Sequence, residues 1–380
     1  MIQTILMESD YDLTKESGTA LNRESESKRA FKEDGPRKTH IGGQALLEGV
    51  MMRGKYGWAV GVRQPDGGLY TEEHPLSKKG DRPQWFSWPL VRGCVALVDS
   101  LVLGFKALEV AVNNAFDDED ESYSDKQKRT FEKVEETFAP SAELSSREST
   151  APDEGILSKA EMTFALILGL MLAIALFILL PALASNVLVG EYEQNPFVWN
   201  IVDGIMRVII FIFYVWLIGR MSDIKRMFAY HGAEHKTIHC YEHGMPLTLE
   251  NAKQFPRLHV RCGTAFLIMV MLIAILVYTI VPLDAAIDAL GISGPAAFAL
   301  LLVVRIALMP VIAGVSYETT VKWAGSHPDN PLVRVVLWPG MQMQRLTTNE
   351  PDEGMLECAI AAMEQVINQE IRIETKLQAE

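Results

Sequence analysis

Residues 231–244 read HGAEHKTIHCYEHG and contain four of the chain's eight histidines. His231 and His235 are four residues apart, so on a helix their imidazoles lie one turn apart and can bind one metal ion. Glu234 lies beside them and completes the H-x-x-E-H order of inverted zincins. In that chemistry zinc lowers the pKa of its bound water to about 7, and the glutamate accepts a proton from that water. The motif therefore predicts a zinc site with Glu234 as general base.

A catalytic zinc site of this kind needs a third protein ligand. The segment RLHVRCGT brings an imidazole and a thiol close to the motif in sequence, and these two donors together suit zinc. The sequence does not choose among the candidates, which are His259, Cys262, His239, Glu242 and Glu318. The alternative interpretation is a cytosolic helix whose histidines hydrogen-bond to neighbouring groups.

The histidine motif is predicted to form a helix over residues 222–243, with Ser222 as its cap. At about 100° per residue, His231 and His235 share an apolar face that is predicted to point inward, and His239 lies at the edge of that face. The opposite side is predicted to face outward and carries Ala229, Ala233, Lys236, Cys240 and His243. Cys240 is therefore disfavoured as a ligand.

Four long apolar stretches are each close to the roughly 20 residues that cross a bilayer as a helix. They cover about 163–188, 200–220, 264–283 and 296–316. The loops 189–200 and 283–295 contain no Lys or Arg, whereas the segment 220–261 contains seven. The positive-inside rule then places both termini and the His-rich loop 221–263 in the cytoplasm. The sequence thus predicts a multi-pass membrane protein, with a four-helix transmembrane domain over 160–320.

The remaining residues are predicted to lie outside the membrane. Residues 1–38 are charged and low in aromatics, which is typical of a disordered tail. Residues 117–159 contain thirteen acidic and six basic side chains and are predicted to be an acidic disordered linker. Between these segments, residues 39–116 are predicted to form a small cytosolic α+β domain. The fold class is therefore a mainly α polytopic membrane protein with a small α+β N-terminal domain.

Local patterns predict the elements of these cytosolic parts. The run WAVGV, the turn residues QPDGG and the run LYTEE indicate a hairpin within 41–76. A long apolar helix is predicted over 91–115. It carries charged side chains that would each cost about 2.5–3.5 kcal/mol at the centre of a span, so it is predicted to pack in the cytosolic domain or along the membrane. The C-terminal region 321–380 is predicted to contain an amphipathic helix over about 352–370 that docks on the N-terminal domain or the membrane.

Composition narrows the classes of partner. Hydrophobic residues make up 49% and charged residues 22% of the chain, which indicates membrane-spanning parts joined to soluble parts. The net charge is −13 and no basic stripe is present, so nucleic acid is not an expected partner. The four cysteines are too scattered for a disulfide scaffold. The expected partners are the lipid bilayer and a membrane-associated substrate or protein.

Charged residues also occur within the predicted spans. Arg305 lies near the middle of the fourth span, where an ionisable residue indicates either a functional site or a structural anchor. If Arg305 lines a path, it favours an anionic substrate or a polar cavity. Asp203 and Arg207 are four residues apart in the second span and are predicted to form a structural pair.

Four blocks of the chain resemble the bacterial YqhQ-like membrane proteins, which are described as predicted metal-dependent enzymes of unknown substrate. They are GGQALLEGVMMRG (42–54), HGAEHKTIHCYEHG (231–244), HVRCGTAF (259–266) and PGMQMQRLTTNEPDE (339–353). Val260 stands where the family pattern has proline, and His243 stands where no histidine is expected. The resemblance implies a polytopic membrane protein with a metal role, and it specifies no reaction.

Three functions follow as hypotheses. The first is a zinc-dependent hydrolase with a cytosol-facing site. The second is transport or delivery of a metal or another small solute, for which Arg305 and the soft sulfurs of Met51, Met52, Met341 and Met343 are the further candidates. The third is a non-catalytic membrane scaffold whose histidines are structural.

Overall fold

The computed structural model describes Ala30 and residues 39–76, 83–115, 168–169, 171–190, 195–281, 283–292, 294–324, 327 and 330–379. These residues form two compact units. The first unit combines the N-terminal strands with the histidine helix and the C-terminal helices, and the second contains the apolar helices. Nearly all of the predicted tail 1–38 and the whole predicted linker 117–159 lie outside the described residues.

The N-terminal strands of the first unit form one antiparallel sheet in the order β1-β2-β3-β4. The strands are β1 (Gly42–Leu46), β2 (Gly49–Arg53), β3 (Gly57–Arg63) and β4 (Leu69–Pro75). Arg63 pairs with Leu69 across the last turn, in which Gly67 has a φ of 85° that glycine adopts without strain. The predicted hairpin is therefore confirmed.

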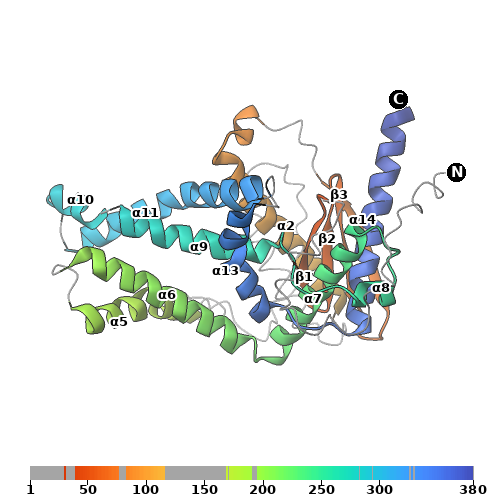
Figure 1. Cartoon of the computed structure of the whole chain (residues 1–380), viewed down its shortest axis with the longest axis horizontal. Coiled ribbons are helices and arrows are strands. Elements are labelled where there is room, and N and C mark those ends of the chain that lie inside the picture. Colours follow the sequence, from red (N-terminus) through yellow and green to blue (C-terminus); the bar gives the residue numbers. More distant parts are fainter. Residues whose placement is uncertain are drawn as a thin grey trace, which may run out of the picture. The chain divides into compact units, whose positions relative to one another are not determined.

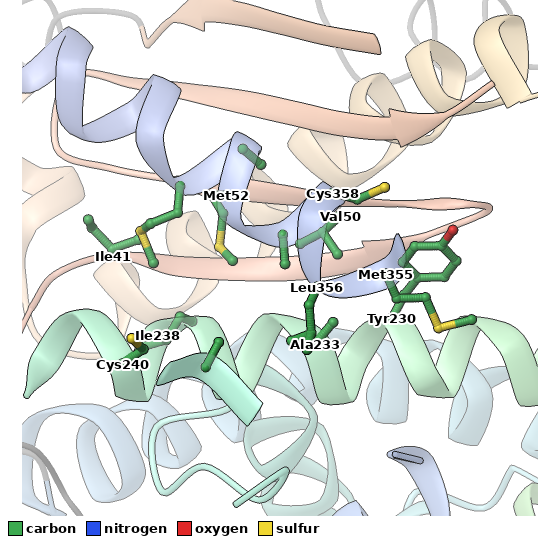
Figure 2. Close-up of a cluster of buried hydrophobic side chains, with 14 of the residues drawn as sticks. Ile41, Val50, Met52, Tyr230, Ala233, Ile238, Cys240, Met355, Leu356 and Cys358 are labelled. Atoms are coloured by element: carbon green, nitrogen blue, oxygen red, sulfur yellow. The ribbon is translucent and has the colours of Figure 1, made fainter. Parts of the chain in front are cut away.

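Helices from distant parts of the sequence complete the first unit. They are α7 (Ser222–Glu242), α8 (Leu249–Lys253), α13 (Pro331–Thr347) and α14 (Glu353–Ala379). Helix α14 lies along the strands (Figure 1), and its side chains pack against β2, β3 and α7. Figure 2 shows Val50 and Met52 of the sheet, Leu356 of α14 and Ala233 of α7 meeting in one apolar core. Helix α14 is longer than predicted and docks on the N-terminal domain, which is one of the two predicted positions.

Helix α7 is buried on two opposite sides. Ala229, Ala233 and Cys240 belong to the core shared with the sheet and α14, so the prediction that this side faces outward is wrong. Helical periodicity identifies two faces, but it does not show that a sheet covers one while a loop and another helix cover the other. His231 and His235 lie on the second buried side, which leaves them away from the apolar core.

The carboxylate of Glu48, in the turn between β1 and β2, accepts hydrogen bonds from side chains of α7. Arg226 Nε donates to Glu48 Oε1 at 2.7 Å, and the Tyr230 hydroxyl donates to Glu48 Oε2 at 3.1 Å. The hydrogen bonds from Arg226 hold the pKa of Glu48 below its usual value, and burial opposes this shift only in part. A carboxyl group with a lowered pKa in the folded state stabilises that state above its ordinary pKa and loses this contribution as the pH falls.

Replacing Glu48 with glutamine should therefore lower the free energy of unfolding by about 1 kcal/mol at neutral pH, the scale of a partly exposed ion pair. The difference from wild type should shrink as the pH falls below the ordinary pKa of a glutamate, because the wild-type protein loses the contribution of this lowered pKa as Glu48 takes up a proton. Thermal unfolding of the two proteins at both pH values measures this. Glu364→Gln, at an exposed position of α14, is the matched control. A difference of equal size at both pH values would contradict the assigned role.

The second unit consists mainly of apolar helices. They include η5 (Ala175–Leu179), α5 (Leu180–Val189), α6 (Pro196–Ile218), α9 (Gly263–Ile280), α10 (Leu283–Ala289), α11 (Gly294–Tyr317) and η7 (Glu318–Trp323). Among the described residues, three stretches are long and apolar enough to cross a membrane, namely Met171–Val189, Phe197–Ile218 and Ala299–Trp323. The predicted span at 264–283 corresponds to α9. The described chain is thus mainly helical, with three candidate spans and a small antiparallel sheet.

Helix α2 (Val91–Ala115) forms where predicted, and a short 3-10 turn, η3 (Gln84–Ser87), precedes it. It belongs to the second unit, whereas the prediction grouped residues 39–116 into one domain with the sheet. The physical reason is its packing on α11, where a Cβ atom on Gly93 would lie 2.9 Å from Gly314 Cα. Arg92 Nε also donates to Glu318 Oε1 at 2.6 Å.

Candidate metal centre

Three histidines of α7 line the side that faces the segment before α9 and the end of α13. His231, His235 and His239 recur every four residues, so successive turns of the helix carry them. All three are buried, with exposed fractions of 7%, 1% and 0%. His239 therefore belongs to this buried side, although the sequence placed it only at the edge. The arrangement is a row of imidazoles shielded from bulk water.

The first cluster joins His231 and His235 to Cys262. His231 Nε2 lies 3.2 Å from Cys262 Sγ, and one ligand atom from each of the three residues lies within 4.8 Å of the others. The two imidazole rings are 4.4 Å apart between centroids. Among the open candidates for a third ligand, Cys262 is the one that the fold brings to this histidine pair.

Backbone carbonyls fix the orientation of both rings. His231 Nδ1 lies 2.8 Å from the carbonyl oxygen of Thr347, and His235 Nδ1 lies 2.6 Å from that of Arg257. Each Nδ1 must donate its proton to such an acceptor, which leaves the Nε2 lone pair of a neutral ring directed at the cluster. His235 Nε2 is buried and has no hydrogen-bond partner of normal geometry in the described part of the chain. Metal-binding histidines are held in this way by a bond from the other ring nitrogen.

The electrostatics of the cluster favour a thiolate. Burial alone would raise the pKa of the Cys262 thiol, but the nearby His231 and His235 lower it well below its usual range. Burial likewise opposes protonation of His231, yet the charge and hydrogen bond of Cys262 raise the pKa of this imidazole to about 9. In the metal-free chain, one proton on the histidines therefore balances the negative sulfur. A divalent cation can take the place of that proton.

Glu234 lies between this cluster and the sheet. The backbone N–H of Gly43 donates to its buried carboxylate, and the charges of His235 and His231 lie close enough to act on it. Burial raises the pKa of Glu234, and the two histidines counteract this only in part. A carboxylate with a raised pKa is a better proton acceptor near neutral pH than an ordinary one. The sequence block 42–54 suggested no role for Gly43, which the structure places in contact with the motif glutamate.

Replacing Gly43 with alanine should displace Glu234. A Cβ atom at this position would lie 2.8 Å from Cγ and Cδ of Glu234 and 2.7 Å from the carbonyl oxygen of Met51. Overpacking of this kind costs about 1–3 kcal/mol, which thermal unfolding can measure. Gly42→Ala is the matched control, because nothing lies within 4 Å of a Cβ atom there. Equal stability of the two variants would show that Glu234 is not confined by the sheet.

The second cluster contains His239, Glu242 and His259, whose ligand atoms also lie within 4.8 Å of one another. Arg261 donates to both carboxylate oxygens of Glu242 at 2.5 Å, and the Thr39 hydroxyl donates to Oε1 at 3.1 Å. Burial lowers the pKa of both histidines well below the usual value, so both rings are neutral. Because Arg261 already neutralises Glu242, this cluster is better suited to positioning His259 than to holding a cation.

A glutamine of α13 fastens the loop that carries Cys262. Gln344 accepts a hydrogen bond from the backbone N–H of His259 and donates one to its carbonyl, both at 2.9 Å. Sequence reasoning did not identify Gln344 or Thr347 as site residues. The only signal for them was the block 339–353, which contains both. The geometry of the first cluster therefore depends on three separate segments of the first unit.

Comparison with known proteins identifies the family of this chain. The family described as "Protein of unknown function (DUF1385)" matches residues 88–369. The chain belongs to the DUF1385 family. A protein of Bacillus subtilis (strain 168) named "Uncharacterized protein YqhQ" is 27% identical over 329 residues, which cover 87% of this chain and 92% of that protein. No solved structure matches the chain. The predicted resemblance to YqhQ-like proteins of unknown function is therefore confirmed.

The DUF1385 match contains both histidine clusters, whereas Gly43 lies before it. Two other predicted residues of this DUF1385 chain lie in the second unit, not in either cluster. Glu318, a candidate ligand, pairs with Arg92 of α2, and Arg305 lies within α11. His243 is half-buried rather than solvated, because its ring contacts Phe255 at 4.7 Å between centroids and its Nδ1 lies 2.7 Å from the carbonyl oxygen of His239.

Proposed function

We propose that this DUF1385 protein is a zinc-dependent enzyme of the membrane that hydrolyses a membrane-associated substrate. The observation that carries the proposal is the convergence of two buried imidazole nitrogens and one thiol in a single cluster. His231, His235 and Cys262 supply these atoms, and both rings are held by backbone carbonyls through their other nitrogens. An oriented set of this kind is typical of a metal site.

The donor set favours zinc over harder cations. Imidazole and thiolate suit zinc, whereas Mg²⁺ and Ca²⁺ prefer oxygen ligands. Three protein ligands also leave a fourth position open, as catalytic zinc sites do. A bound zinc ion would supply Lewis acidity and lower the pKa of a coordinated water to about 7.

Glu234 has the position and environment of a general base. Its carboxylate is buried beside both histidines, and the Gly43 amide orients it from the sheet. Its raised pKa suits acceptance of a proton during hydrolysis and its return to a leaving group. His259, held by Gln344, and Arg261 with Glu242 would fix the loop that carries Cys262.

The membrane arrangement belongs to the same proposal. Four spans, with α9 as the third, would cross the bacterial inner membrane, and both termini and the loop 221–263 would lie in the cytoplasm. Three candidate spans and the uneven distribution of Lys and Arg support this topology. The metal cluster would then meet its substrate on the cytosolic side.

These contacts give less support to the two alternative functions, which are transport of a metal or another solute and a non-catalytic scaffold. The methionines that would suit Cu(I) transport are buried, and they include Met52 in the core with α14 and Met341 against Leu258. Their sulfurs therefore contribute to packing, which is the commoner role of methionine. A non-catalytic scaffold remains the function to consider if purified protein holds no metal.

Cobalt substitution tests the ligand set. Protein purified without an affinity tag, stripped by a chelator and reloaded with Co²⁺ should show the absorption of a cobalt–thiolate bond, because Cys262 is a proposed ligand. Cys262→Ser should lose this absorption. Cys94→Ser, in α2 of the other unit, should keep it. Persistence of the band in Cys262→Ser would rule out the proposed thiolate ligand.

A further inference from the structure

A polar cavity lies among the apolar helices α6, α9 and α11 of the second unit, and the proposed metal centre does not use it. Its volume is about 140 Å³, several times what one water molecule needs. Its polar lining consists of Asn200, Asp203, Arg207, Tyr278 and Arg305. The helices meet there closely, since a Cβ atom on Gly204 of α6 would lie 2.4 Å from Ile275 of α9. A cavity with this many polar groups within apolar helices calls for a ligand that matches them.

The charges that line the cavity do not cancel. Arg207 Nε donates to Asp203 Oδ2 at 2.7 Å, so these two side chains neutralise each other. Arg305 is the second cation, and its guanidinium lies 5.3 Å from the centroid of the Tyr278 ring. Arg305 Nε is buried and has no hydrogen-bond partner among the residues that the structure describes. One positive charge is therefore left for an anion, and a charge among apolar helices strongly favours such a partner.

The cavity also offers an unused acceptor. Asp203 is only 7% exposed, and its Oδ1 atom has no hydrogen-bond partner in the described part of the second unit. A bare anion would satisfy Arg305 and leave this oxygen unpaired. A ligand that satisfies both groups carries a negative group for Arg305 and, a few bonds away, a hydroxyl that donates to Asp203.

We propose that this cavity binds a phosphate monoanion that carries a hydroxyl group. Phosphate oxygens accept hydrogen bonds from the guanidinium of Arg305, which matches their geometry well, and the hydroxyl donates to Asp203. One negative charge balances the net positive charge of the lining. A glycerol phosphodiester lipid headgroup and free dihydrogen phosphate share this chemistry. Apolar side chains exposed on the same helices, such as Ile205, Ile209, Val303 and Ile306, give acyl chains a surface to contact.

Two binding measurements on the full chain distinguish these sources. Native mass spectrometry of detergent-solubilised protein compares retention of phosphatidylglycerol with that of phosphatidylcholine, whose headgroup has no net charge and no hydroxyl. Thermal unfolding in the presence of inorganic phosphate tests the free anion. Selective retention of phosphatidylglycerol supports a lipid ligand, and stabilisation by phosphate supports a free one. Wild-type protein that shows neither selective retention of phosphatidylglycerol nor stabilisation by phosphate overturns the proposal.

Variants of the lining residues test whether the binding takes place in the cavity. Arg305→Gln should weaken it about tenfold or more, as expected for loss of a charged hydrogen-bond donor, and Asp203→Asn should weaken it by less. Arg220→Gln is the matched control, because Arg220 stacks on Trp216 at 4.2 Å and does not line the cavity. Arg305→Lys keeps the charge and should retain part of the binding even if Arg305→Gln fails to fold. Undiminished binding in Arg305→Gln would overturn the proposal.

Discussion

Protein in which both His231 and His235 are replaced with alanine should lose its bound metal. These residues supply two of the three atoms in the first cluster, and Cys262 alone is a poor site for zinc. Elemental analysis of untagged protein should show the metal content falling from about one ion per chain to near zero. The expected loss is large because a four-coordinate ion with two ligands removed has no closed set of donors.

His243→Ala is the matched control for this double variant. His243 directly follows the same helix and is partly buried, but it makes no contribution to the first cluster. It should keep its metal, and both variants should retain the helical circular dichroism of wild type. Metal that remains bound in the double variant would show that the ion sits elsewhere.

Replacing Glu234 with glutamine should separate metal binding from catalysis. The substitution keeps the size of the side chain and removes the proton acceptor, while the three ligand atoms stay in place. The variant should therefore keep its metal and lose about 10²–10⁴-fold in the rate of hydrolysis, the usual contribution of general base catalysis. Hydrolysis of ester and peptide reporters by detergent-solubilised protein measures the rate, alongside elemental analysis.

Glu250→Gln is the matched control, because Glu250 is an exposed carboxylate at the start of α8 in the same unit. It should hydrolyse reporters at the wild-type rate. An undiminished rate in Glu234→Gln would show that Glu234 is not the general base. Loss of both metal and hydrolysis would assign Glu234 to the ligand shell instead.

The sequence identified the histidine pair because local spacing determines it. Two histidines four residues apart in a stretch with helical caps must lie on adjacent turns, whatever the helix packs against. The proposed third ligand depends on tertiary folding, since Gln344 of α13 holds the loop that brings Cys262 to the pair. Spacing in the sequence left Cys262 and His259 equal, and only the fold separates them into two clusters.

Helical periodicity in the sequence could not predict other contacts of the site. The contact between Gly43 and Glu234 joins residues that are far apart in the chain, and it requires the register of a sheet against a helix. Cys240 was correctly directed away from the histidines, but the sheet and α14 that bury it could not be inferred from α7 alone. Likewise, the apolar helix α2 was predicted with its correct bounds, whereas its packing partner α11 was not.

The central claim is that His231, His235 and Cys262 hold a zinc ion, and elemental analysis of the untagged wild-type protein tests it most directly. Such protein, purified from zinc-replete cells without chelators, should contain about one zinc ion per chain. Cys262→Ser protein prepared in parallel should contain much less. Wild-type protein that is folded and contains no stoichiometric metal would contradict the claim.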